Sequence, residues 1–199
     1  MKRAEQEQGF TLIEMLVAIV IIGIVMVPLS NVLIGFLRTD GTASARLDES
    51  HDAQIAATYW AQDVASIGIR QPYDLGTKTF PLAQSVNVSF PCSTPAGSST
   101  VVTLGWDELD AAGTPSAVRV AYVRTGTDLV RLRCDGGSLT STATLAHNLN
   151  GAPAVTCSTS CTGSGSAVPQ TITLTFDISD PSGKGQPYSL TLAGQRRQS

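Results

Sequence analysis

The chain has few of the residues that enzymes use for catalysis. Among its 199 residues there are two histidines, and charged residues make up 15% of the total. The signatures GxSxG, HExxH, the phosphate-binding P-loop and the dinucleotide-binding glycine fingerprint do not occur in the sequence. His51 and His147 stand in segments that favour packing over general-base catalysis. We therefore expect a protein that is not an enzyme and uses no cofactor.

Blocks of positive charge are also missing. Thirteen Lys and Arg residues stand against sixteen Asp and Glu, the net charge is −3 and the pI is near 5.3. The basic residues are scattered, which argues against a broad nucleic-acid-binding surface. The length leaves room for one domain and an additional element, and no internal repeat is present.

Cysteines are few, and all of them lie in the second half of the chain. Neither histidine is spaced near a cysteine pair as a zinc site requires, so we expect no metal. If this half is exported, two disulfides are the economical interpretation, with three connectivities. We favour Cys157–Cys161, which closes the short CSTSC loop, and Cys92–Cys134, which joins two strands.

One long hydrophobic run is present, from Phe10 to Leu29, and it is long enough to cross a membrane of about 30 Å as a helix. Lys2 and Arg3 precede it, which predicts a cytoplasmic N-terminus and an exported remainder. A cleavable secretory signal is the alternative, but the small-residue segment at 43–45 lies too far beyond the run. Glu14 is the one charged residue inside this run. A charge at membrane depth costs roughly 2.5 kcal/mol or more, so we expect this acid to have a function.

The helical pattern continues past the hydrophobic run. Apolar residues recur at steps of three and four as far as Ile67, which predicts one helix from Phe10 to about Ile67. We expect Pro28 to bend this helix and Gly41 to weaken it.

Beyond residue 70 the hydrophobic period changes to two, and turn residues separate short runs. The fold class expected is α+β: a long N-terminal helix, membrane-spanning and then amphipathic, packed on an antiparallel β-sheet head. The expected strands are Val86–Phe90, Val101–Trp106, Ala117–Arg124, Leu129–Cys134, Ala154–Cys157, Thr171–Ser179 and Tyr188–Ala193.

Two hairpins stand out among these strands. The last two strands alternate apolar residues on one face across residues 180–185. In the earlier hairpin a shared apolar face requires Tyr122 opposite Val130 and a three-residue loop, Thr125 to Thr127. The residues expected on that face are Val118, Val120, Tyr122, Val130, Leu132 and Cys134.

This register places Arg119 opposite Arg133, with Arg131 beside them. Like charges directly opposite each other destabilise a sheet, so we expect the three arginines to attract an anion. The favoured interpretation is a solvated face relieved by acids of the same fold. The alternative is a candidate anion-binding face for the phosphates of DNA.

Glu14 acquires a partner if a protease cuts between Gly9 and Phe10. The new amine of Phe10 is cationic at neutral pH, and Glu14 lies one helical turn further on the same face. The partner is either the chain's own amine or that of a neighbouring subunit. In the second case, burial of the pair would fix the axial register of assembly.

The sequence GFTLIE at residues 9–14, followed by apolar residues to about 30, resembles the class III signal of type IV pilins and pseudopilins. The resemblance implies that a prepilin peptidase removes residues 1–9 and N-methylates Phe10. It also implies that Glu14 engages the Phe10 amine of an adjacent subunit, and that the helix between Gly23 and Pro28 loosens in the filament.

The resemblance divides the chain into a leader (1–9), a transmembrane and filament-core helix (10–30), its amphipathic continuation (31–69) and a β-rich head (70–199). The large head is similar to those of minor subunits, such as the J-type pseudopilin of type II secretion or competence minor pilins. Such a subunit sits in the cytoplasmic (inner) membrane before assembly with other pilins into a fibre at the cell surface. The alternatives are a fibre-borne adhesin or DNA-capture subunit that uses the arginine face, and an unprocessed single-span protein.

Overall fold

The structure, a computed structural model, describes residues 11–109, 113–179 and 187–197. Gly9 and Phe10, the residues of the expected cleavage site, lie outside this range. The chain forms two compact units, Met1–Ser44 and Ala45–Ser199, which we call unit 1 and unit 2.

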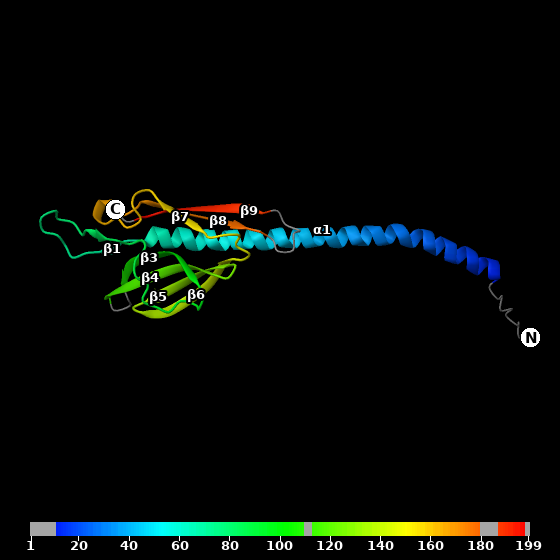
Figure 1. Ribbon diagram of the computed structural model, residues 1–199, viewed down its shortest axis with the longest axis horizontal. Coiled ribbons are helices and arrows are strands. Elements are labelled where there is room, and N and C mark those ends of the chain that lie inside the picture. The colour runs from blue at the N-terminus through cyan, green and yellow to red at the C-terminus, as the bar shows by residue number, and fades with distance from the viewer. Residues whose placement is uncertain (1–10, 110–112, 180–186, 198–199) are drawn as a thin grey trace, which may run out of the picture. The chain divides into compact units, whose positions relative to one another are not determined.

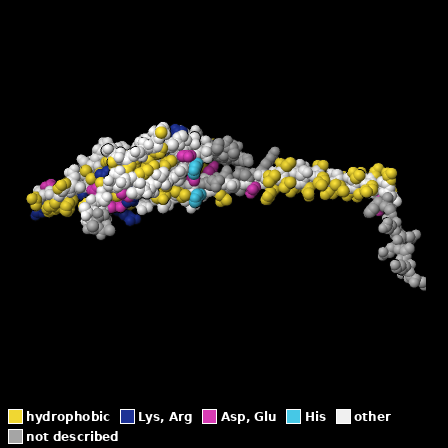
Figure 2. Space-filling view, turned by 90° about the horizontal axis from the view of Figure 1, so that it is seen from below, with side chains coloured by type: hydrophobic (Ala, Val, Ile, Leu, Met, Phe, Trp, Pro, Cys, Tyr) yellow, Lys and Arg dark blue, Asp and Glu magenta, His cyan; other side chains and the backbone are white. Residues whose placement is uncertain are grey.

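Helix α1 spans Leu12–Ser66, with Glu14 in its first turn and Pro28 in its interior. The predicted long helix is therefore confirmed over the described residues. In its unit 1 part, every described side chain from residue 11 to residue 37 is exposed. Figure 2 shows hydrophobic side chains along this part of the helix. The segment Leu12–Leu37, with a mean hydropathy of 2.8, is long and apolar enough to cross a membrane.

Unit 2 contains three antiparallel sheets around the second part of α1. The sheets are β1-β2, β3-β4-β5-β6 and β7-β8-β9. Figure 1 shows the β3–β6 sheet on one side of α1 and the β7–β9 sheet on the other. The strands are β1 (Ile69–Arg70), β2 (Leu82–Ala83), β3 (Ser99–Leu109), β4 (Pro115–Thr125), β5 (Asp128–Asp135), β6 (Ser138–Ala146), β7 (Ala154–Cys157), β8 (Thr171–Ile178) and β9 (Tyr188–Gln195).

The strand predictions succeed where apolar residues alternate, but three observed strands were not expected and one expected strand does not form. The short strands β1 and β2 have only two residues each, too few to show an alternating pattern. Six expected strands correspond to β3, β4, β5, β7, β8 and β9. Strand β6 was not expected, because its sequence SLTSTATLA is rich in Ser and Thr and has few large apolar residues. The expected strand Val86–Phe90 does not form; it makes a single bridge, Val86 to Leu104.

The predicted register of the β4-β5 hairpin is wrong by one residue. Tyr122 lies opposite Arg131, and Val123 lies opposite Val130. The pairing of Thr125 with Asp128 leaves a two-residue turn, in which Gly126 has a φ of 61°. Glycine in the first position of a two-residue turn supplies the positive φ that a hairpin turn of this length needs.

The one-residue shift puts apolar residues on both faces of the sheet. Val118, Val120, Tyr122 and Leu129 belong to the main core, which also contains Trp60 of α1. Ala121, Val123, Val130 and Leu132 form a second cluster on the other face, against which Phe90 packs. Of the segment expected as the strand Val86–Phe90, Phe90 therefore packs on this second face, whereas Val86 belongs to the main core.

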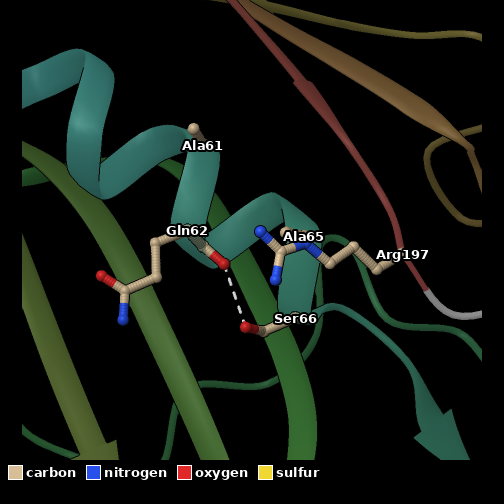
Figure 3. Close-up of a pocket in the computed structure, with 5 residues that line it drawn as sticks. All are labelled: Ala61, Gln62, Ala65, Ser66 and Arg197. Carbon is tan, nitrogen blue, oxygen red and sulfur yellow. Dashed lines mark hydrogen bonds between the residues drawn. The ribbon is translucent and has the colours of Figure 1, made fainter.

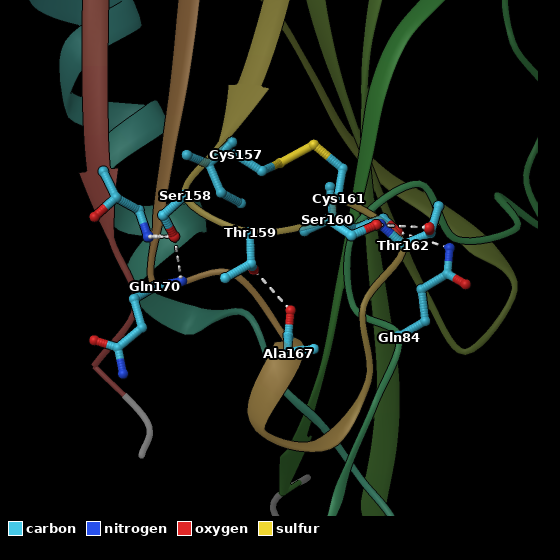
Figure 4. The surroundings of a disulfide bond; sticks show 12 residues. Gln84, Cys157, Ser158, Thr159, Ser160, Cys161, Thr162, Ala167 and Gln170 are labelled. Carbon is cyan, nitrogen blue, oxygen red and sulfur yellow. Dashed lines mark hydrogen bonds between the residues drawn. A yellow bond between two sulfur atoms is a disulfide. The ribbon is translucent and has the colours of Figure 1, made fainter.

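Both disulfides favoured by the sequence, Cys92–Cys134 and Cys157–Cys161, are present. The first fastens the chain just after Phe90 to β5. The second closes a short loop after β7, shown in Figure 4. There the Ser158 hydroxyl accepts hydrogen bonds from the backbone N–H groups of Gln170 and Thr171, each at 3.1 Å.

The β8-β9 pairing agrees with the alternation predicted for the last hairpin, since Leu174 faces Leu192 and Phe176 faces Leu190. Helix α1 packs closely against this sheet. The indole Nε1 of Trp60 donates a hydrogen bond to the Ile172 carbonyl at 3.2 Å. Gly194 leaves no room for a side chain, because a Cβ there would lie 2.5 Å from the Cβ of Val64.

Candidate processing and assembly site

Glu14 lies in the first turn of α1 with an exposed side chain. Its Oε2 is 3.5 Å from the backbone N of Thr11, at the outer limit of a hydrogen bond. A carboxylate suits this position, because the first turn of a helix carries the positive end of its dipole. Within residues 11–109, 113–179 and 187–197, no basic group forms a salt bridge with Glu14. The carboxylate is therefore available to a cation outside the described chain.

Gly23 and Pro28 both lie inside α1. A Cβ at Gly23 would meet nothing within 4 Å, so no packing contact in the chain explains the glycine. Proline in a helix interior removes one backbone hydrogen bond, and glycine lowers helix propensity by about 1 kcal/mol relative to Ala. The helix is continuous through both positions, and their role in filament flexibility stays a prediction.

The three arginines of the expected anion-binding face do not share a face. Arg131 lies on the α1 side of the sheet and is buried, with its Nε and Nη2 each 2.7 Å from a carboxylate oxygen of Asp63. The Tyr122 hydroxyl donates to the same carboxylate at 2.7 Å, and the Tyr59 ring lies 4.8 Å from the Arg131 guanidinium carbon. Arg131 is therefore a structural ion-pair partner of the helix.

Arg133 and Arg119 are also paired with acids of the same fold. Arg133 bonds Glu108 at 2.8 Å and Asp135 at 3.0 Å. Arg119 lies opposite Cys134 on the other face and is 3.9 Å from Asp107. The predicted anion-binding or DNA-binding face is therefore wrong, because it depended on the incorrect register. The favoured interpretation, relief by acids of the fold, describes the pairing, although Arg131 is buried and not solvated.

The buried cluster of Asp63, Tyr122 and Arg131 changes the titration of its members. Burial, followed by the charge of Asp63, raises the pKa of Tyr122 well above its usual value of 10.0. Burial alone would lower the pKa of Arg131, but its hydrogen bonds and attraction to Asp63 outweigh that effect and raise it. Both residues thus keep their protons at physiological pH.

The sequence alone did not identify Asp63 as the partner of Arg131. The sequence contains a signal for a buried partner, because Asp63 lies in the apolar stripe that Tyr59, Val64 and Ile67 form along the helix. An acid in such a stripe is rarely buried without a partner. The sequence does not say which of the ten arginines pairs with it, since that depends on the β4-β5 register.

The two histidines lie apart from the sites described above. His147 Nδ1 lies 2.9 Å from Asp52, and its ring is half-exposed, while His51 is exposed. In the part of the chain that the structure describes, no group of three or more His, Cys, Asp or Glu is placed to hold a metal ion.

Figure 3 shows an open pocket of about 480 Å³ at the end of α1. It is lined by Ala61, Gln62, Ala65 and Ser66 of the helix and by Arg197. The Ser66 hydroxyl donates to the Gln62 carbonyl at 2.9 Å. No nucleophile paired with a base faces this pocket among those residues, so we assign it no chemistry.

The comparisons with known proteins concern the N-terminal segment. The family model described as a prokaryotic N-terminal methylation motif matches residues 6–30. No curated protein matches the chain, and no solved structure does. The match covers the expected cleavage site, Glu14 and most of the candidate membrane span, in agreement with the resemblance found in the sequence. The chain therefore carries the class III signal of type IV pilins and pseudopilins at its N-terminus.

Proposed function

We propose that this chain is a minor pilin or pseudopilin, a structural subunit of a type IV pilus or of a type II secretion-like fibre. The observation that carries the proposal is the methylation motif at residues 6–30, which leads into an apolar helix with a single acid in its first turn. A prepilin peptidase removes residues 1–9 and methylates the amine of Phe10. The remaining chain assembles with other pilins through the helix that begins with residues 10–30.

In this proposal Glu14 sets the axial register. The methylated amine of Phe10 keeps its positive charge, and Glu14 has no salt-bridge partner among the described residues. In hydrocarbon, a carboxylate and an ammonium lower their free energy most when they form an ion pair. Alignments of neighbouring subunits that separate the two groups are therefore disfavoured. The continuous helix across Gly23 and Pro28 can then loosen locally as subunits pack.

The minor role is supported by the resemblance and by the large head with its three sheets. Before assembly the protein spans the cytoplasmic membrane through residues 10–30, with the N-terminus in the cytoplasm and the disulfide-containing head outside. Disulfides are typical of such oxidising compartments. No enzymatic role and no cofactor form part of the proposal.

The register argument is tested by Glu14→Val in the full chain. The variant becomes more apolar and stays membrane-inserted, so we expect its amount in sheared fibres to fall about tenfold, the effect of about 1.4 kcal/mol. Immunoblots of membrane and fibre fractions measure this ratio. Val17→Glu/Glu14→Val, which moves the acid by three residues, serves as the matched control and is expected to remain defective. Normal incorporation of Glu14→Val would overturn the register role.

A plain single-span membrane protein is the competing function. It predicts that the chain keeps its leader and never enters a fibre. Replacing Gly9 by a large residue distinguishes the two, because a peptidase substrate would then accumulate with residues 1–9 attached, whereas an unprocessed protein would show no change in mass apart from the substitution.

A further inference from the structure

The connection between β6 and β7 contains the sequence Asn150-Gly151, the one Asn-Gly pair in the chain. The three other asparagines, Asn31, Asn87 and Asn148, precede Val, Val and Leu. Asparagine is a thermolabile residue, because the backbone nitrogen of the next residue can attack its side-chain amide. Glycine in the next position favours this attack, since it has no Cβ to hinder it and its backbone adopts many conformations.

Asn150 and Gly151 are both exposed and lie in an irregular stretch of the connection. Solvent therefore reaches the side-chain amide and the backbone nitrogen that would attack it. Gly151 has a φ of 94°, and a Cβ at this position would meet nothing within 4 Å. The peptide between the two residues is thus not restrained by packing against the described part of the chain.

Hydrogen bonds hold the chain before this pair but not after it. The backbone N of Leu149 donates to the Thr127 carbonyl at 2.7 Å, and the backbone N of Asn150 donates to the Asp177 carbonyl at 2.8 Å. Among the residues that the structure describes, none accepts a hydrogen bond from the backbone N–H of Gly151. The attacking nitrogen is therefore available, and Asn150, which carries the amide, is anchored through its own backbone.

We infer that Asn150 is a site of spontaneous modification, at which the head converts an amide into a carboxylate. The backbone N of Gly151 attacks the side-chain carbonyl carbon of Asn150 and loses its proton to solvent. The C–N bond of the side-chain amide breaks, ammonia leaves, and a succinimide ring remains. Water then opens the ring at either carbonyl, which gives aspartate or isoaspartate. No atom is oxidised or reduced, and water is the co-reactant.

The structure distinguishes Asn150 from the other three asparagines. At Asn148 the attacking nitrogen would be that of Leu149, which is buried and already donates a backbone hydrogen bond. Asn31 lies inside α1, where backbone N–H groups donate along the helix. Asn87 is exposed, but the branched side chain of Val88 follows it and hinders the attack.

The two Asp-Gly pairs of the chain are also protected. Aspartate before glycine forms the same ring, with loss of water in place of ammonia. After Asp135, however, the backbone N of Gly136 donates to the Ala117 carbonyl at 3.0 Å. Asp40 and Gly41 lie within α1, so the helix must open locally before the ring can form.

The modification changes the charge and the backbone of this connection. The new carboxylate is ionised at neutral pH, and isoaspartate also adds a carbon atom to the main chain between Leu149 and Gly151. The strands on either side keep their own partners, since β6 pairs with β5 and β7 pairs with β8. The head thus keeps its fold and gains a negative charge. This inference does not depend on the proposed function, because a chain that retains its leader would be modified in the same way.

The test incubates the full-length chain in detergent at physiological temperature and mildly alkaline pH. An isoaspartyl methyltransferase with a labelled methyl donor quantifies isoaspartate, and fragmentation spectra of peptides locate it. We expect isoaspartate and aspartate to accumulate at residue 150, and faster as the pH rises, because the deprotonated nitrogen attacks. Asn150→Gln should abolish this signal, since glutamine would have to form a larger ring. Asn148→Gln, at a second exposed position of the connection, is the matched control and should leave it unchanged.

The denatured chain separates the structural argument from the sequence. In denaturant, residues 135 and 148 lose the hydrogen bonds that protect them and should also form isoaspartate, whereas residue 150 should be the main site in the folded chain. Asn150 that stays unmodified in the folded chain, over a time in which the denatured chain reacts, would overturn the inference. Equal rates at residues 135, 148 and 150 in the folded chain, or an undiminished signal in Asn150→Gln, would overturn it as well.

Discussion

At the scale of single residues, the fold depends on charges that are matched across secondary-structure elements. Asp63 and Arg131 are almost completely buried, and the pair makes two hydrogen bonds of 2.7 Å between α1 and β5. A buried ion pair adds little net stability over apolar residues, but removal of one partner leaves an uncompensated charge. The pair thus fixes where the helix lies on the sheet.

Arg131→Met should lower the free energy of unfolding by about 3–5 kcal/mol, because Asp63 stays buried without its partner. Arg197→Met, at an exposed position, should change it by less than about 0.5 kcal/mol. Denaturant titration of the full chain in detergent, followed by tryptophan fluorescence, measures both. The double variant Asp63→Leu/Arg131→Met should recover most of the loss, and a double variant as unstable as Arg131→Met would contradict this account.

The raised pKa of Tyr122 predicts how the stability of the head changes at alkaline pH. Burial and the Asp63 charge raise its pKa in the folded state above the unfolded value, so the folded chain holds the phenol proton where the unfolded chain loses it. The resulting stability is complete below about pH 10 and declines above it, by about 1.4 kcal/mol per pH unit. Unfolding free energies measured between about pH 9 and 11 should fall more steeply for the native chain than for Tyr122→Phe. Parallel pH profiles would contradict the assignment.

At the scale of secondary-structure elements, the close approach of α1 to β9 depends on Gly194. The space for a side chain is occupied by Val64, which is completely buried. Helix and sheet can approach this closely only where one of the two surfaces lacks a side chain.

Gly194→Ala should therefore lower the free energy of unfolding by about 1–3 kcal/mol through overpacking. In a Val64→Ala background the same substitution should cost less, because the clashing methyl groups are gone. A double-mutant cycle by denaturant titration measures the difference. If Gly194→Ala costs the same in both backgrounds, the contact does not determine the packing.

The elements also show what the sequence could predict. Helix α1 and strands β8 and β9 were found because their hydrophobic periods are regular and one face is buried. Strand β6 was missed because Ser and Thr dominate its exposed edge position. The β4-β5 register was wrong because apolar residues occur on both faces, so alternation alone does not choose between two registers, whereas Gly126 indicates the shorter turn.

At the scale of the whole molecule, the N-terminal segment can be identified from the sequence alone, whereas the head cannot. A family model matches residues 6–30, so this segment is recognised from a short stretch of sequence. The pairing of Asp63 with Arg131 joins residues that are distant in sequence. Its prediction therefore required the fold.

In the proposed function, a peptidase converts this chain into an assembly-competent subunit by creating a cation at Phe10 for Glu14 to bind. Mass spectrometry of the chain isolated from membranes of the producing cell tests this directly. We predict that residues 1–9 are absent and that the polypeptide begins with N-methylated Phe10. A mature polypeptide that still begins with Met1 would contradict the account.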